Sequence, residues 1–313
     1  MKKYIFMVLT VIMFALECGA SSRYIESQRK EKKEVNQTKQ LRTCGLEDRP
    51  LRITAFATNP PFSWVEIKGE GNRTVFVSKG FLIDFIKEIA QELNIAVEAV
   101  GYPTDSKMLA DFQVGNVDMI VGMYYDPKLR VGGNMFLTPS VIQNVISVVF
   151  MKGKEKTVEK WEDLVGLKGV VRQDEQFYNY IRLMLPKTLE IAEAVDSREA
   201  FTKLLTGEAD YFLSSPYAAE AEARRFKMNL DVSMIPVPLM GQELTALYSG
   251  RSLCKKYAYE IANKIKEKKK DKNAMKSNLI SYINAWGQRF KDDTSLKSQL
   301  ESVSAPETEV DTQ

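Results

Sequence analysis

A short pattern occurs twice in this chain, and it limits the possible folds more than any other feature. Each copy has a large apolar residue, a glycine three positions later and an aspartate three positions after the glycine, followed by an apolar run of strand length; the copies span 112–121 and 204–213. Glycine suits the left-handed residue that closes a helix, so each copy predicts a helix end, a stop and a strand. The copies lie too far apart for a solenoid repeat, and they predict two similar α/β lobes.

The segments before the first copy indicate a parallel sheet. The alternation of apolar residues from Leu51 predicts a strand that ends at an Asn-Pro-Pro-Phe turn, and residues 95–100 predict a second strand. Between them a helix is predicted from Gly80, because apolar side chains recur at helical spacing. These core residues are Phe81, Leu82, Phe85, Ile86, Ile89, Ala90 and Leu93. A strand, a helix and another strand in this order are typical of a parallel sheet.

The second half of the chain continues to alternate between strands and helices. The β-branched run 141–151 predicts a long strand that crosses from one lobe to the other. Further strands are predicted at 168–172, 234–238 and 243–248, and helices at 157–164, 177–185, 197–205, 255–270 and 273–286, with Ser197 as a helix cap.

The composition excludes several classes of protein. Lysine and arginine number 44 against 41 aspartates and glutamates, and there is no histidine. This near balance argues against a nucleic-acid-binding protein, which is usually basic on one face. The lack of histidine removes the commonest general base and most zinc sites. We therefore expect no metal and no other cofactor.

The N-terminus has the layout of a secretory signal. Lys2 and Lys3 precede an apolar run over 4–16, and small residues up to Ala20 offer a cleavage site, so residues 1–20 are predicted to be a signal peptide. Lipid attachment at Cys18 is the weaker alternative, because Glu17 stands where a small residue is expected. Residues 21–50 are predicted to be a charged, disordered leader and residues 291–313 a disordered tail, since both are polar and poor in large apolar side chains.

Export would place the mature chain in an oxidising compartment. Cys44 and Cys254 remain after removal of the signal peptide, and two thiols in such a compartment more often pair than stay free. We therefore expect a disulfide between them. The alternative is one buried and one exposed thiol that never meet.

Arg130 is the candidate ligand-binding residue that the sequence suggests first. It lies in a loop between two apolar runs of the segment 118–139, and an Asp-Pro pair and a Gly-Gly pair flank it. An arginine held at the end of a buried strand can bind a carboxylate through its planar fork of donors. The alternative interpretation is a surface loop with a solvated arginine.

Over residues 51–286 the order of motifs resembles the family 3 extracellular solute-binding proteins. The motifs are Pro60-Pro61-Phe62-Ser63, Gly80-Phe81 with Asp84, Gly115-x-x-Asp118, Gly122-Met123, Arg130 with Phe136 and Pro139, Asp163-Leu164-x-Gly166 and Gly207-x-x-Asp210. The resemblance implies the type II periplasmic-binding fold, in which two α/β lobes are joined by a two-strand hinge. It places lobe 1 at 51–142 plus 247–290 and lobe 2 at 143–246, so that both cysteines belong to lobe 1.

The resemblance also implies a function and a site. A small solute with a carboxylate, an amino acid above all, would bind in the cleft, close the lobes and be presented to an ABC permease at the inner membrane. The implied protein is a periplasmic monomer without enzyme activity. In this family the arginine at the position of Arg130 pairs with the ligand carboxylate. The residues after the strand, here Met123 and Tyr124, contribute backbone or side-chain bonds to that carboxylate, Gly122 is a further candidate beside them, and Phe62 helps to wall the pocket.

Several positions depart from the family pattern. Ser215, or its neighbour Ser214, stands where amino-acid binders usually carry an aspartate for the ligand ammonium, and Asn59 stands where an aromatic ring often stacks on the ligand. Glu175 is then either the ammonium partner or the cap of the next helix. Tyr102 and Asp105 are further cleft candidates, or simply polar loop residues.

Two other functions remain open from the sequence. One is a cleft enzyme of the cyclohexadienyl dehydratase type, in which a carboxylate such as Glu175 would act as a general acid. The other is a ligand-sensing module that acts on a separate receptor.

Overall fold

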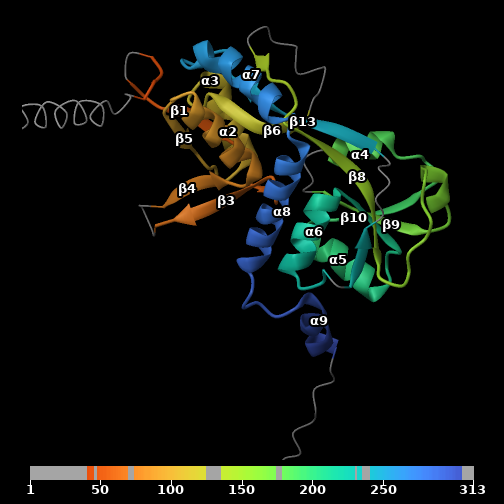
Figure 1. Ribbon diagram of the computed structural model, residues 1–313. Coiled ribbons are helices and arrows are strands. Elements are labelled where there is room, and N and C mark those ends of the chain that lie inside the picture. Colours follow the sequence, from red (N-terminus) through yellow and green to blue (C-terminus); the bar gives the residue numbers. More distant parts are fainter. Residues whose placement is uncertain are drawn as a thin grey trace, which may run out of the picture. The chain divides into compact units, whose positions relative to one another are not determined.

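The fold is described from a computed structural model (Figure 1), in which residues 41–45, 48–69, 74–124, 135–173, 178–229, 231–234 and 240–304 are placed. Contacts divide the chain into two units, residues 1–42 and 43–313, and the fold below is that of the second unit. Most of its strands join one sheet in the order β10-β9-β11-β8-β13-β6-β1-β5.

One half of this sheet, with its helices, is called lobe 1. Its strands are ordered β5 (Val97–Ala99), β1 (Leu51–Thr54), β6 (Met119–Tyr124), β13 (Met240–Tyr248) and β7 (Phe136–Leu137). Strand β1 is parallel to both β5 and β6, whereas β13 is antiparallel to β6 and β7.

The other half, called lobe 2, repeats this arrangement. Its strands are ordered β10 (Glu190–Ala194), β9 (Lys168–Arg172), β11 (Tyr211–Ser214), β8 (Ile142–Met151) and β12 (Val232–Met234). Strand β9 is parallel to β10 and β11, and β8 is antiparallel to β11 and β12. The two halves therefore have the same topology, as the repeated Gly-x-x-Asp pattern predicted.

Strands β8 and β13 join the two lobes. They pair antiparallel from Ile142 opposite Leu244 to Ile146 opposite Met240, and each then enters the sheet of a different lobe. The prediction of a long crossing strand at 141–151 is confirmed by β8. Its partner β13 is longer than the strand predicted at 243–248.

The helices surround the sheet, and a small second sheet lies beside lobe 1. The helices are α2 (Phe81–Glu92), α3 (Asp105–Val114), α4 (Tyr178–Met184), α5 (Ser197–Thr206), α6 (Pro216–Arg225), α7 (Ala258–Lys268), α8 (Lys272–Gln288) and α9 (Leu296–Ser304), with 3₁₀ turns η3 (Trp161–Leu164) and η4 (Lys255–Tyr257). The small sheet has the order β2 (Thr58–Asn59), β3 (Ser63–Lys68) and β4 (Val75–Lys79).

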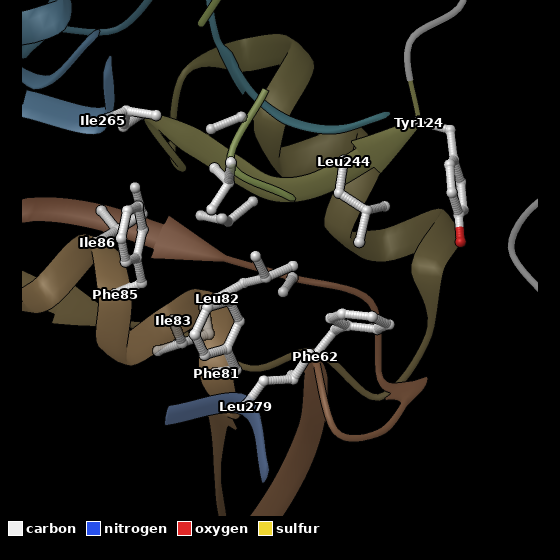
Figure 2. Packing of buried hydrophobic residues seen from close by; sticks show 14 of the residues in the cluster. Phe62, Phe81, Leu82, Ile83, Phe85, Ile86, Tyr124, Leu244, Ile265 and Leu279 are labelled. Atoms are coloured by element: carbon white, nitrogen blue, oxygen red, sulfur yellow. The ribbon is translucent and has the colours of Figure 1, made fainter. Parts of the chain in front are cut away.

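The apolar stripe of α2 fills the core of lobe 1, as its helical spacing predicted. Phe81, Leu82 and Ile86 are at most 2% exposed, and they belong to one cluster with residues of the sheet and of α7 and α8. Figure 2 shows this packing, with Tyr124 at one side of the cluster and apart from the α2 side chains. A cluster of this size stabilises the lobe, because each fully buried large apolar side chain contributes about 1.5–3 kcal/mol.

The N-terminal boundary of lobe 1 differs from the sequence prediction. Cys44 is fully buried in a disulfide with Cys254, 210 positions later, and the two Cα atoms are 4.9 Å apart. Arg49 pairs with Asp118, which directly precedes β6. The expected disulfide is thus present, and the leader predicted to extend to residue 50 is wrong over 43–45 and 48–50, because a covalent bond and an ion pair fix this segment to lobe 1.

The C-terminal boundary also differs. A disordered tail was predicted from residue 291, but α9 lies against α5, and Leu296 is 1% exposed in the core of lobe 2. The Leu296 amide donates to the Phe226 carbonyl at 3.1 Å. Few apolar residues suffice here because one of them, Leu296, is completely buried.

Two helix starts differ from the prediction in detail. The cap of α5 is Asp196 rather than Ser197, since the Asp196 carboxylate accepts the amide hydrogen of Glu199 at 3.0 Å. The helix predicted over 157–164 forms only the short turn Trp161–Leu164, because residues 154–158 have no regular structure.

Candidate ligand-binding site

The two lobes are connected by a hydrogen-bond chain at the carboxyl ends of their strands. Asn144 of the crossing strand β8 is 1% exposed, and its Nδ2 donates to the Tyr124 hydroxyl at 2.7 Å. The Ser215 hydroxyl donates to Asn144 Oδ1. Tyr124 ends β6 in lobe 1, and Ser215 follows β11 in lobe 2. Two residues that the sequence suggested separately, Tyr124 and Ser215, are therefore linked through a third residue that it did not suggest.

A second contact between the lobes lies next to this chain. Phe62 is fully buried, and its ring meets Tyr217 of α6 edge to face, with ring centroids 6.0 Å apart. Helix α6 begins directly after Ser215 with a proline at its first position, which suits a helix start. The carboxyl end of β11 thus positions both Ser215 and Tyr217 against lobe 1.

Gly122 has a backbone role. It is the extra residue of a β-bulge, because Val121 and Met123 pair with the adjacent residues Ala246 and Thr245. Its φ is +86°, and a Cβ atom there would lie 2.7 Å from Leu82 Cδ1, so only glycine fits. The bulge is held by the Thr245 hydroxyl, which donates to the Met123 carbonyl at 3.1 Å. Gly122 and Met123 therefore shape the end of β6 that carries Tyr124.

Two buried polar atoms, one at the end of β2 and one at the end of β11, have no hydrogen-bond partner among the described residues. One is Oδ1 of Asn59, which is 4% exposed, and the other is the hydroxyl of Ser214, which is 1% exposed. A buried polar group without a partner costs free energy, about 1–3 kcal/mol. Such atoms are retained at sites where a water or a ligand completes the bonding.

Tyr102 and Asp105 lie within lobe 1. Tyr102 is 8% exposed and its hydroxyl bonds to Asp111 of α3; burial, with this bond, raises the pKa of Tyr102. Asp105 begins α3 beside the β1–β2 connection. Removal of water by the surrounding chain raises the pKa of Asp105, and the amide of Ala57, which donates to the carboxylate, opposes that rise. Neither side chain is joined to the Tyr124–Asn144–Ser215 chain.

Arg130 and Glu175 lie outside the described residues. The strand ends that precede them are described: β6 ends at Tyr124, and β9 ends at Arg172. Their proposed roles therefore remain predictions from the sequence.

Helix α8 makes a further connection between the lobes. Trp286 packs on Trp64 of β3, with ring centroids 5.3 Å apart, and its Nε1 donates to Glu222 of α6 at 2.8 Å. Arg289 forms an ion pair with Glu66 of β3. Partial burial alone would raise the pKa of Glu66, but hydrogen bonds from Trp64 and Arg289 and the Arg289 charge lower it below the usual value.

Sequence reasoning missed Asn144, Tyr217 and Trp286. Only Asn144 left a usable signal, because it is a polar residue inside a β-branched run that was expected to be buried. A buried amide in such a run needs partners, and partners at that position come from both lobes. The other two look like ordinary aromatic residues of helices.

The described residues contain no group of three or more histidine, cysteine, aspartate or glutamate residues placed to hold a metal ion. Among the same residues, no helix is both long and apolar enough to cross a membrane.

Comparison with known families decides the classification. The model of the bacterial extracellular solute-binding proteins, family 3, matches residues 51–301. This chain belongs to that family. A search of curated proteins finds no match.

Solved structures confirm the type II periplasmic-binding fold. An ancestral cationic amino acid solute-binding protein, AncCDT-1, is 22% identical, with 75% of this chain and 95% of that chain covered and a TM-score of 0.57. The amino acid ABC transporter substrate-binding protein AbpA from Streptococcus pneumoniae, bound to L-arginine, is 16% identical, with coverages of 76% and 95% and a TM-score of 0.54. The GluR0 ligand-binding core in complex with L-glutamate is 14% identical, with coverages of 76% and 97% and a TM-score of 0.55.

Proposed function

We propose that this family 3 protein captures a small solute with a carboxylate, in the first place an amino acid, between its two lobes. The observation that carries the proposal is the buried chain from Tyr124 through Asn144 to Ser215, which joins the strand ends of both lobes. A ligand at this junction would contact both lobes at once, and contacts of that kind favour the closed form over the open one.

Arg130 is the proposed partner of the ligand carboxylate. It follows Tyr124 by six positions in the sequence, so the strand that supplies Tyr124 leads directly into the arginine loop. A guanidinium binds a carboxylate through two parallel hydrogen bonds and stays charged at any working pH. The unpartnered hydroxyl of Ser214, which directly precedes Ser215 at the end of β11, supports a polar ligand at this strand end.

The proposed partner of the ligand ammonium is Glu175. The position where relatives usually carry an aspartate is Ser215, whose hydroxyl is already bonded to Asn144. A neutral hydroxyl provides no charge for an ammonium group. Glu175 follows β9 of lobe 2 by three positions, and it would supply that charge from the second lobe.

The proposal includes export and delivery to a transporter. The N-terminal signal would direct the chain to the periplasm, where it would act as a monomer and present the closed, liganded form to an ABC permease. Of the solved structures with the same fold, AbpA is bound to L-arginine and the GluR0 ligand-binding core is in complex with L-glutamate. A charged amino acid is therefore the first class of ligand to test. Binding without chemical change is proposed, as in these neighbours.

A thermal-shift screen tests the ligand class. Each amino acid would be compared with the amine that lacks its carboxylate and with the keto acid that lacks its ammonium group, and prephenate would complete the panel. A ligand that binds only the folded protein raises the melting temperature by mass action. We expect stabilisation by one or a few amino acids and none by the matching amines.

Two outcomes would reject the proposal. Equal stabilisation by an amine and its amino acid would show that the carboxylate is not recognised. Stabilisation by prephenate-like acids alone, with their turnover, would favour the dehydratase alternative. Stabilisation by a keto acid equal to that by its amino acid would reject only the role of Glu175.

A further inference from the structure

Ligand binding does not explain the strongly basic segment of lobe 1. Residues 255–276 hold nine lysines and three acidic residues, although the formal net charge of the whole chain is only +3. The segment forms the turn η4, helix α7 and the start of α8. Its charge is therefore concentrated on neighbouring helical turns of one lobe.

Carboxylates on lobe 1 pair with only part of this charge. Lys268 lies 2.7 Å from Glu88 and 2.7 Å from Glu92 of α2, and Lys264 lies 3.5 Å from Glu92. These two lysines face α2 and neutralise its acidic side chains. Lys269 lies 3.9 Å from Glu243 of β13. The other six lysines are exposed and form no ion pair with a carboxylate of the described residues; we call them the basic face: Lys255, Lys256, Lys266, Lys270, Lys272 and Lys276.

The basic face spans three consecutive elements: Lys255 and Lys256 lie in η4, Lys266 lies in α7, and Lys270, Lys272 and Lys276 lie at or just before the start of α8. The inner side of α7 is buried through Ala258, Ile261, Ala262 and Ile265. On the outer side, Tyr259 is 72% exposed between the lysines, and Leu253 is 53% exposed just before them. An amphipathic ring and an apolar side chain among lysines suit the boundary between lipid headgroups and acyl chains, where lysine stems lie along apolar surface and their charges reach water.

The disulfide fixes the start of this face to the core of lobe 1. It joins Cys44 to Cys254, with Cα atoms 4.9 Å apart, and Cys254 directly precedes Lys255.

We infer that the basic face binds a membrane surface of anionic lipids and thereby orients the protein on it. The face matches such a surface in charge and in its exposed Tyr259 and Leu253. Each lysine near an anionic surface is attracted independently, so several of them together give a weak but cumulative affinity. An acidic protein partner is the competing occupant, and the experiment separates the two.

The test is co-sedimentation of the full chain with vesicles of phosphatidylcholine, with or without phosphatidylglycerol. The test variant replaces four lysines of the face, Lys255→Gln, Lys256→Gln, Lys266→Gln and Lys270→Gln. The matched control replaces four exposed lysines of lobe 2, Lys152→Gln, Lys154→Gln, Lys156→Gln and Lys187→Gln. Both variants keep the leader and have the same net charge, so a difference between them reports the position of the lysines.

We expect the wild type to bind phosphatidylglycerol vesicles more tightly than phosphatidylcholine vesicles, and this preference to fall as salt increases. The face variant should bind the anionic vesicles at least about tenfold more weakly, whereas the control should stay within about twofold of wild type. Tyr259→Ala should weaken binding by a smaller factor and leave the salt dependence unchanged. Unchanged melting temperatures would show that all variants are folded.

Three results would overturn the inference. The first is equal binding of the wild type to the two kinds of vesicle. The second is an equal loss of binding in the face variant and the control, which would indicate a general charge effect. The third is binding of the face variant to anionic vesicles as tight as that of the wild type, which would leave the face to an acidic protein.

Discussion

The two Gly-x-x-Asp segments, residues 115–118 and 207–210, make the same hydrogen bonds to the backbone but have different surroundings. In lobe 1 the Asp118 carboxylate accepts the Arg52 amide at 2.8 Å, and in lobe 2 the Asp210 carboxylate accepts the Lys168 amide at 2.8 Å. In each case the aspartate amide donates back to the carbonyl of the same partner, at 2.9 Å and 2.7 Å. Both glycines are left-handed, with φ of 86° and 79°. In both lobes, the repeated pattern therefore produces a strand whose first residues are hydrogen-bonded to the adjacent strand.

The surroundings differ because the N-terminal segment of the chain packs on lobe 1, whereas the C-terminal helix packs on lobe 2. Asp118 is fully buried, and both of its oxygens bond Arg49 at 2.7 Å, beside the disulfide of the N-terminal segment. Asp210 is exposed, and no arginine of the described residues pairs with it. The C-terminal helix α9 packs on lobe 2 instead. It contributes the buried side chain of Leu296, and its Gln299 accepts a hydrogen bond from Arg198 at 2.7 Å. The aspartate of the repeated segment is thus buried in the core of lobe 1 and exposed on the surface of lobe 2.

The largest expected effect comes from Asp118→Ala. The change removes a buried carboxylate and leaves the Arg49 guanidinium without it, and breaking a buried ion pair from one side costs about 3–5 kcal/mol. Urea unfolding of the variant would measure the loss. A loss below about 1 kcal/mol would show that the ion pair does not support lobe 1.

The next largest effect is expected from the double change Cys44→Ala and Cys254→Ala. The disulfide closes a long loop, and its removal should lower the free energy of unfolding by about 2–4 kcal/mol. Reduction of the wild type should give a similar loss, whereas the double variant should not respond to a reductant. Ready labelling of the native, unreduced protein at both cysteines by a thiol reagent would contradict the bond.

Leu296→Ala tests whether helix α9 belongs to the core of lobe 2. Because the side chain is 1% exposed, its truncation should cost about 2–3 kcal/mol in unfolding by urea. Leu183→Ala is the matched control, since Leu183 is 83% exposed and should change stability by less than about 0.5 kcal/mol. Equal effects of the two would mean that α9 does not belong to the core of lobe 2.

The smallest effect is expected from Asp210→Ala. The carboxylate makes one bond to a backbone amide at an exposed position, and its loss should cost about 1 kcal/mol. Urea unfolding would compare the loss of stability in this variant with the loss in Asp118→Ala. If both aspartates contributed equally, the comparison between a buried and an exposed aspartate would fail.

Local patterns in the sequence predicted much of the fold. The glycine stops, the apolar stripe of α2 and strand β9 at 168–172 are set by neighbouring residues, and all of them are present. The leader predicted over 21–50 and the tail predicted over 291–313 were expected to be disordered, because their composition is polar. Their order comes from a few long-range contacts, chiefly Cys44 with Cys254, Arg49 with Asp118 and Leu296 with lobe 2, which composition cannot show.

The candidate site was predicted less completely. Tyr124 and Ser215 were suggested by the resemblance to the family, and the structure connects them through Asn144. That connection depends on the crossing of β8 and β13, which brings distant segments together. Tyr102 was suggested as a cleft residue, but its hydroxyl is bonded to Asp111 inside lobe 1.

The most direct test of the account is a calorimetric titration of the most stabilising amino acid into the wild type, Arg130→Ala and the control Arg182→Ala. Arg182 is an exposed arginine of lobe 2 that pairs with Glu193 on the surface. The account predicts one site per chain in the wild type and in the control. In Arg130→Ala it predicts a loss of affinity of about a hundredfold or more, with an unchanged melting temperature of the free protein. Affinity retained within a few-fold in Arg130→Ala, or a free protein that melts several degrees lower, would contradict the proposal that Arg130 binds the ligand carboxylate.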